Sequence, residues 1–166
     1  MTFIDNIHHI SLEIEESVIE EISTACKAAY PNELGGFLIG HYSSDMACAK
    51  VTQMIVPPKY EAGPTSFQRD TDGLNAFWDE LFKKGLYYLG EWHSHPNGSA
   101  QYSNTDKNAL SNIAKCDTVN IKNPIMVIFG YKEQKMIKIK AYYYRCEKII
   151  KYNEYLSLIH ISEPTR

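Results

Sequence analysis

The chain has few cysteines, no excess of basic charge and no long apolar run, and each absence excludes a class of protein. Its four cysteines, Cys26, Cys48, Cys116 and Cys146, form no Cys-x-x-Cys pair, which argues against a disulfide framework and a thiolate zinc site. The 17 basic and 20 acidic residues are well mixed, unlike the charge pattern of proteins that bind nucleic acid or anionic membranes. No segment reaches the roughly 18 consecutive apolar residues of a membrane-spanning helix. The N-terminus also lacks a signal-peptide pattern. We therefore expect a cytoplasmic protein with reduced cysteines, and neither nucleic acid nor membrane among its partners.

The remaining composition is typical of one globular domain. The 166 residues are 44% hydrophobic and 12% aromatic, enough to bury a core but too short for two domains. The last ten residues, SLIHISEPTR (157–166), match the translation of a common sequencing adapter in one reading frame. We interpret them as non-native and leave His160 out of the site. The predicted domain therefore spans residues 1–156.

Apolar patterns along the chain predict alternating strands and helices. Strands are predicted at 8–14, 34–42, 47–58, 86–95, 124–131 and 135–145, and helices at 15–30, 72–84 and 105–116. A further short helix is predicted to begin near Glu147, and residues 59–71 form a polar excursion. This order, with short connections, indicates an α/β (α+β) fold in which helices flank a mixed central β-sheet.

Two histidines at the end of the predicted strand 86–95 are candidate metal ligands. In an extended strand the side chains at i and i+2 point the same way, so His93 and His95 can converge on one ion. Asp106 can be a third ligand if the start of the next helix folds back against the strand. Two imidazoles and a carboxylate, with a fourth position open to water, are typical of a catalytic zinc site. Histidines at strand ends are also often structural, and Ser103-x-x-Asp106 is equally the signature of a helix capping box.

The motif as a whole resembles a known family. HSHP (93–96), six residues and then SNTD (103–106), with ELGG (33–36) upstream, resemble the JAMM motif of JAB/MPN/Mov34 metalloproteases. The similarity is greatest to prokaryotic JAB peptidases of mobile elements and anti-phage operons, including the deconjugating peptidase of CBASS defence systems. It covers nearly all of the chain and implies an MPN/JAB-like fold. Tyr102, where many relatives have proline, and Leu34, where threonine is frequent, depart from the family pattern.

The resemblance implies a role for each motif residue. It implies that His93, His95 and Asp106 hold Zn²⁺, that Glu33 is the general acid/base, and that Ser103 helps to stabilise the oxyanion. These roles fit the chemistry of amide hydrolysis, which needs a base near the water, a proton for the leaving amine and positive charge at the developing oxyanion. Glu91, two residues before His93, is a competing candidate for the general base. It could instead hold the metal ligands in position without binding the metal, or point outward.

The function implied is that of a zinc-dependent isopeptidase. Its partner would be a protein with an extended C-terminal tail, either a ubiquitin-like protein or a conjugated nucleotidyltransferase. The alternatives are a JAMM peptidase that processes a sulfur-carrier protein and a non-catalytic MPN-type interaction module. From the resemblance, residues 63–70 are interpreted as a substrate-side loop or edge strand, which could pair with the tail; an ordinary surface connection is the alternative. The tyrosines of AYYYR (141–145) are interpreted as packing residues rather than as a platform for bases.

Overall fold

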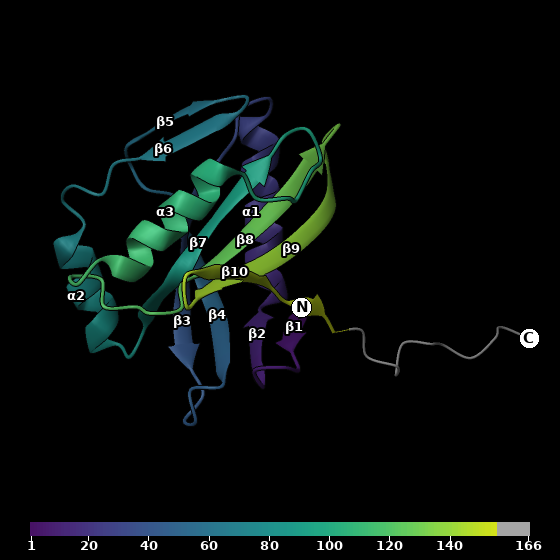
Figure 1. Cartoon of the computed structure of the whole chain (residues 1–166). Coiled ribbons are helices and arrows are strands. Elements are labelled where there is room, and N and C mark those ends of the chain that lie inside the picture. The colour runs from purple at the N-terminus through teal and green to yellow at the C-terminus, as the bar shows by residue number, and fades with distance from the viewer. Residues whose placement is uncertain (156–166) are drawn as a thin grey trace, which may run out of the picture.

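A curved nine-stranded sheet forms the centre of the computed structural model, which describes residues 1–155 (Figure 1). The strand order is β10-β9-β8-β7-β3-β4-β2-β1-β11. The strands are β1 (Thr2–Asp5), β2 (Ile10–Ile14), β3 (Gly35–Tyr42), β4 (Cys48–Ile55), β7 (Tyr87–His95), β8 (Ile125–Lys132), β9 (Lys135–Arg145), β10 (Lys148–Lys151) and β11 (Asn153–Glu154). β7 pairs antiparallel with β3 and parallel with β8, so the sheet is mixed.

Helices cover both faces of this sheet (Figure 1). They are α1 (Glu16–Ala29), α2 (Asn75–Lys83) and α3 (Asn104–Lys115). α1 buries Val18, Ile22 and Cys26 in the main core on one face. α3 packs Leu110 and Ile113 on the other face, in a second cluster of buried residues. Because side chains alternate along a strand, β8 and β9 contribute buried residues to both clusters.

The sheet curls until its two ends meet. β10 and β11 lie at opposite ends of the strand order, yet only Tyr152 separates them in the chain. β10 pairs with β9 and β11 pairs with β1, while the Tyr152 amide donates to the Ala141 carbonyl at 2.9 Å. The strand that carries the histidines, β7, lies in the interior of the sheet between β3 and β8.

The predicted fold class, a single α/β domain with a mixed sheet flanked by helices, is confirmed. The short helix predicted near Glu147 is wrong. Cys146 and Glu147 have φ angles of 49° and 64° and form the two-residue turn that joins β9 to β10, which is the geometry that a tight hairpin requires. The helix predicted from Asp72 begins at Asn75 instead, with Leu74 as its N-cap.

The short strands β1, β5 (Tyr60–Gly63) and β11 were not predicted, whereas β6 (Ser66–Arg69) lies within residues 63–70, for which an edge strand was one of the interpretations. β1 precedes the first predicted strand, and the polar excursion contains a separate hairpin of β5 and β6. The interpretation of residues 157–166 lies outside the residues that the structure describes. Within 1–155, no helix is long and apolar enough to cross a membrane.

Candidate metal centre

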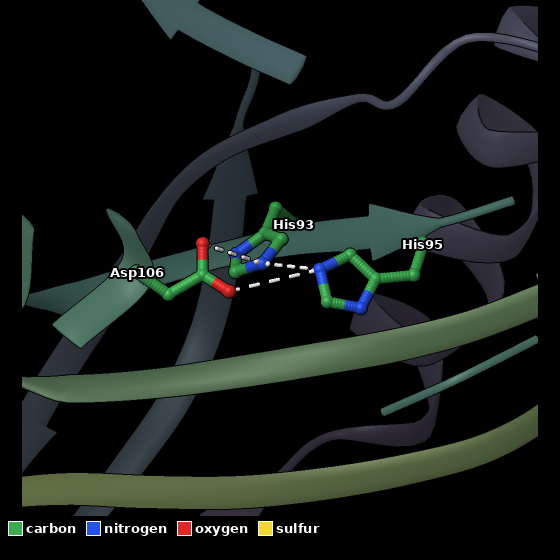
Figure 2. A group of neighbouring side chains, drawn as sticks. All are labelled: His93, His95 and Asp106. Carbon is green, nitrogen blue, oxygen red and sulfur yellow. Dashed lines mark hydrogen bonds and ion pairs between the residues drawn. The ribbon is translucent and has the colours of Figure 1, made fainter. Parts of the chain in front are cut away.

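His93, His95 and Asp106 come together at the end of β7 (Figure 2). One potential ligand atom from each lies within 4.8 Å of the others. The Nε2 atoms of the two histidines are 3.0 Å apart. Asp106 Oδ1 lies 3.3 Å from His93 Nε2, and Asp106 Oδ2 lies 3.7 Å from His95 Nε2. All three side chains are largely buried. They line one cavity between α3 and the sheet, and their donor atoms lie close together there.

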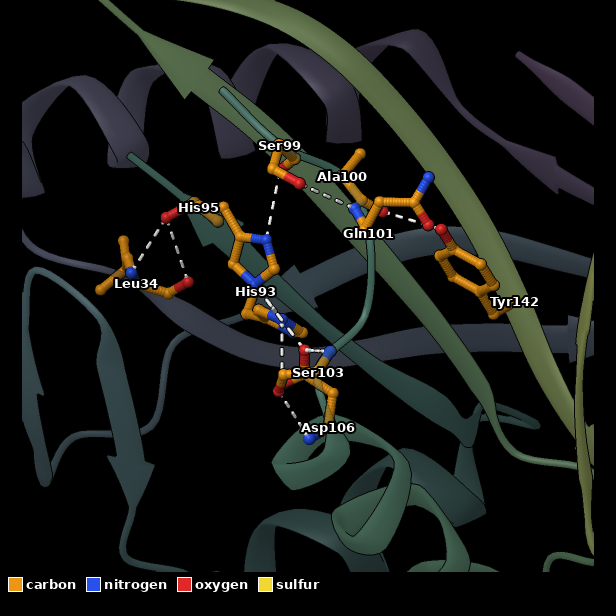
Figure 3. Close-up of polar contacts among 10 residues, drawn as sticks. Leu34, His93, His95, Ser99, Ala100, Gln101, Ser103, Asp106 and Tyr142 are labelled. Atoms are coloured by element: carbon orange, nitrogen blue, oxygen red, sulfur yellow. Dashed lines mark hydrogen bonds and ion pairs between the residues drawn. The ribbon is translucent and has the colours of Figure 1, made fainter. Parts of the chain in front are cut away.

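His95 is oriented by the loop that follows it. Its Nδ1 lies 3.2 Å from the Ser99 carbonyl oxygen (Figure 3), which assigns the hydrogen to Nδ1 and leaves the Nε2 lone pair facing the cluster. Gly130 of β8 makes room for this loop, because a Cβ at that position would lie 2.3 Å from the Gly98 carbonyl oxygen. Burial, with the nearby charge of His93, lowers the pKa of His95 and favours the neutral, metal-binding imidazole.

Asp106 is both a cap of α3 and a member of the cluster. The Ser103 amide donates to Asp106 Oδ2 at 2.8 Å, and the Asp106 amide donates to Ser103 Oγ at 3.1 Å, which together form a capping box. The two interpretations of this motif are therefore compatible. Burial raises the pKa of Asp106, but the bond and charge of His93 and the bonds from Ser103 outweigh it and hold the pKa at about 2. The carboxylate is ionised at neutral pH.

Glu33 lies two residues before β3 begins and lines the same cavity. Its position is fixed through Leu34, whose carbonyl accepts from the Ser94 amide at 2.7 Å and whose amide donates to Ser94 Oγ at 3.0 Å. The Glu33 amide itself donates to the Gly63 carbonyl at 2.8 Å. Burial raises the pKa of Glu33 to about 7, with the charge of His93 lowering it and that of Asp106 raising it.

Glu91, the competing carboxylate, already has partners. Its Oε1 accepts from the Tyr88 hydroxyl at 3.0 Å and forms an ion pair with the Arg69 guanidinium. Burial raises the pKa of Glu91, against the lowering effect of Arg69 and Tyr88. Unlike Glu33, it is tied into a network of its own. Local sequence patterns do not reveal the contacts of Ser94 and Arg69, because their partners are distant in the chain.

The cavity beside the cluster has a volume of about 370 Å³. The hairpin strand β6 forms one wall and helix α3 forms the other, with β7 between them. The residues that these two walls contribute include Ser66, Phe67, Arg69, Thr105, Ala109 and Ile113. Such a cleft, partly apolar and open to solvent, can accept an extended chain next to the His-His-Asp cluster.

A mixed sheet with helices on both faces and a His-His-Asp cluster at the end of a central strand define a JAB-type domain. Residues 15–142 match the prokaryotic homologs of the JAB domain, and the chain belongs to this family. A CD-NTase/cGAS isopeptidase from Enterobacter hormaechei subsp. hoffmannii (strain UCI 50) is 39% identical over 121 residues, which is 72% of this chain and 67% of that protein. The family resemblance of the motif is thereby confirmed, and the isopeptidase relative supports assignment to the hydrolases.

Two solved structures are similar to this chain, and the first of them shows the same fold. Protein DSY2949 from Desulfitobacterium hafniense superposes with a TM-score of 0.65 and 20% identity over 92% of this chain and 99% of that chain. AF2198, a JAB1/MPN domain protein from Archaeoglobus fulgidus, gives a TM-score of 0.46 with 21% identity, covering 78% of this chain and 87% of that chain.

Proposed function

We propose that the protein is a zinc-dependent isopeptidase of the JAMM type. Its substrate would carry an amide bond at the C-terminal tail of a ubiquitin-like or conjugated bacterial protein, in an anti-phage setting. The observation that carries this proposal is the convergence of His93, His95 and Asp106 in a cavity that also contains Glu33. The isopeptidase relative supports the reaction class, and its designation as a CD-NTase/cGAS isopeptidase supports a nucleotidyltransferase conjugate as substrate.

Zinc fits this set of donors. The pKa shifts of His95 and Asp106 favour the neutral imidazole and the ionised carboxylate that zinc binds. Three protein ligands leave a coordination position open, as a catalytic site needs. A zinc ion held there supplies Lewis acidity, which lowers the pKa of water from about 15.7 to about 7 and polarises a carbonyl group.

Glu33 moves the proton. With a pKa near 7, its carboxylate can accept a proton from the attacking water and return it to the leaving amine nitrogen. The water oxygen adds to the carbonyl carbon, and the bond from that carbon to nitrogen breaks. One carboxyl group thus serves both halves of the hydrolysis and ends in its starting state.

Ser103 would assist at the carbonyl oxygen. Its Oγ accepts from the Asp106 amide, so its hydroxyl hydrogen is not used in that bond and can be donated elsewhere. Ser103 also lines the cavity, where this hydrogen can be donated to the oxygen on which negative charge develops. The same serine would cap the helix and stabilise the transition state.

Strand β6 would hold the substrate tail. In the part of the chain that the structure describes, β6 pairs with β5 on one side, and its residues Ser66, Phe67 and Arg69 line the cavity on the other. An extended tail can add to this edge through backbone hydrogen bonds. Phe67 packs closely on Gly35, where a Cβ would lie 2.9 Å from Phe67 Cδ1, so the passage towards the cluster is narrow.

Intact-mass analysis of a fusion substrate tests the proposal. A nucleotidyltransferase fused at its C-terminus to a reporter protein is incubated with zinc-loaded wild type, with Glu33→Gln, and with Glu20→Gln as a control at an exposed glutamate. Wild type and control should cleave at the junction, and Glu33→Gln should be slower by about 10²-fold or more. Equal rates for Glu33→Gln at equal zinc content would contradict the role of Glu33.

The alternatives give different results in the same assay. Cleavage of a sulfur-carrier fusion but not of the nucleotidyltransferase fusion would replace the proposed substrate. Cleavage of neither, together with a ubiquitin-like fusion left intact by zinc-loaded protein, would favour a non-catalytic interaction module.

A further inference from the structure

The hairpin β5–β6 is attached to the main sheet at only a few points. Its strands form a separate two-stranded sheet, which is drawn above α3 in Figure 1. Near its turn, the Gly63 carbonyl accepts from the Glu33 amide at 2.8 Å, and Phe67 packs on Gly35. A two-stranded hairpin is marginally stable alone in water, so its position depends on such attachments.

Arg69, at the far end of β6, makes a further attachment. Its guanidinium forms an ion pair with Glu91 on β7, and the two side chains are 25% and 15% exposed. The Tyr88 hydroxyl donates to the same Glu91 oxygen at 3.0 Å. The Arg69 guanidinium carbon also lies 5.5 Å from the centre of the Phe37 ring on β3. One side chain of the hairpin thus contacts two strands of the main sheet.

This ion pair is well protected from water. A charge that loses its partner in such a place stays desolvated, so separation of the pair is strongly disfavoured. Glu91 and His93 are alternate residues of one strand and point to the same face. The ion pair therefore connects the hairpin to the strand that carries the candidate ligands, two residues from the cluster.

We propose that Arg69 is a positioning residue, whose ion pair with Glu91 locks β6 onto the ligand-bearing strand and sets the width of the substrate cavity. The inference rests on the proposed function, since the occupant of the cavity is taken to be a substrate tail. Arg69 and Phe67 line the β6 wall of the cavity, so tail residues remote from the scissile bond run past the ion pair. Its loss should weaken tail binding and leave the reacting groups in place.

Hydrogen exchange tests the lock without any substrate. Zinc-loaded wild type is compared with Arg69→Met, which keeps length but removes charge, and with Lys50→Met, which removes an exposed pair to Glu13. In Arg69→Met the amides of β5 and β6 should exchange about tenfold faster, because the loosened hairpin opens more often. The amides of β3 and β7 should keep their rates in all three proteins. Unchanged protection of the hairpin in Arg69→Met would overturn the inference.

Steady-state kinetics on the cleavable fusion test the effect on binding. Arg69→Met should raise KM about tenfold, equivalent to about 1.4 kcal/mol of tail binding, while kcat and zinc content change little. The double variant Arg69→Met with Glu91→Gln leaves no lone charge buried, so it should recover melting temperature but not KM. Recovery of KM as well would show that Arg69 only neutralises the charge of Glu91, and would overturn the positioning role. If wild type cleaves no fusion, the proposed function fails, and the exchange rates still decide whether Arg69 locks the hairpin.

Discussion

At the scale of single residues, Ser94 connects the candidate base to the candidate ligands. It lies between His93 and His95 but points to the opposite face, as strand alternation requires. There it is 2% exposed and accepts from the Leu34 amide at 3.0 Å. Since Leu34 directly follows Glu33, this bond fixes the distance between the two halves of the site.

Replacement of Ser94 should therefore affect both stability and rate. Ser94→Ala leaves the buried Leu34 amide without its partner, which should lower the free energy of unfolding by about 1–3 kcal/mol. The rate of fusion cleavage should fall while zinc affinity stays the same, because the ligands remain on β7. Urea unfolding and zinc titration measure the two effects, with Asn123→Ala, which removes a distant bond to the Tyr144 carbonyl, as the control. A variant with wild-type stability and rate would show that the Ser94 bond positions nothing.

The three candidate metal ligands could be predicted from local sequence patterns, whereas the candidate base, Glu33, could not. His93 and His95 follow from alternation in a strand, and Asp106 follows from the start of the next helix. Glu33 is 60 residues from His93 in the chain, and no local pattern indicates that they meet. Only the family resemblance pointed to it. The resemblance indicated that residues 63–70 could form an edge strand, but nothing in the sequence indicated that Arg69 pairs with Glu91, 22 residues away.

At the scale of elements, β8 and the loop after His95 depend on each other. Gly130 has no Cβ, and an added one would lie 2.3 Å from the Gly98 carbonyl oxygen. This loop also supplies the Ser99 carbonyl that orients His95. The element boundaries around the site were predicted well where apolar runs are long, as for β7 and β8. They failed at the β9–β10 turn, where two residues with positive φ replace the expected helix.

The substitution Gly130→Ala should therefore weaken zinc binding from a distance. The methyl group must push the loop away, which costs about 1–3 kcal/mol of stability. It should also disturb the His95 hydrogen bond enough to lower zinc affinity by about 10–100-fold. Isothermal titration of zinc into the variant measures the second effect. Wild-type affinity in a well-folded Gly130→Ala protein would show that the loop position is unimportant for the site.

At the scale of the whole molecule, a buried carboxylate helps to close the curled sheet. Asp5 at the end of β1 is 6% exposed, accepts from the Tyr143 hydroxyl of β9 at 2.5 Å, and lies 2.8 Å from His8 Nδ1. Burial raises the pKa of Asp5, but the bonds from Tyr143 and His8 outweigh it and lower the pKa from 3.8 to about 2. Strands from the two ends of the sheet are thus joined across its interior.

This shift predicts how stability depends on pH. The pKa of Asp5 is lower in the folded than in the unfolded state, so its contribution of about 2 kcal/mol is complete above pH 4 and is lost as the pH falls towards 2. Asp5→Asn should be less stable at pH 7 and should lose less stability than wild type between pH 4 and 2. Urea unfolding across this range, with the exposed Asp79→Asn as control, measures the difference. Parallel pH profiles for wild type and Asp5→Asn would contradict this role.

A zinc-binding measurement tests the proposed hydrolysis mechanism most directly, because every proposed step depends on the His-His-Asp cluster. Metal-free wild type, His95→Ala and the exposed control His41→Ala are titrated with zinc by calorimetry, and bound metal is counted by mass spectrometry. We predict one tightly bound zinc per chain in wild type and His41→Ala, and its loss in His95→Ala. Wild type without bound zinc, or His95→Ala with wild-type affinity, would contradict the assignment of the site.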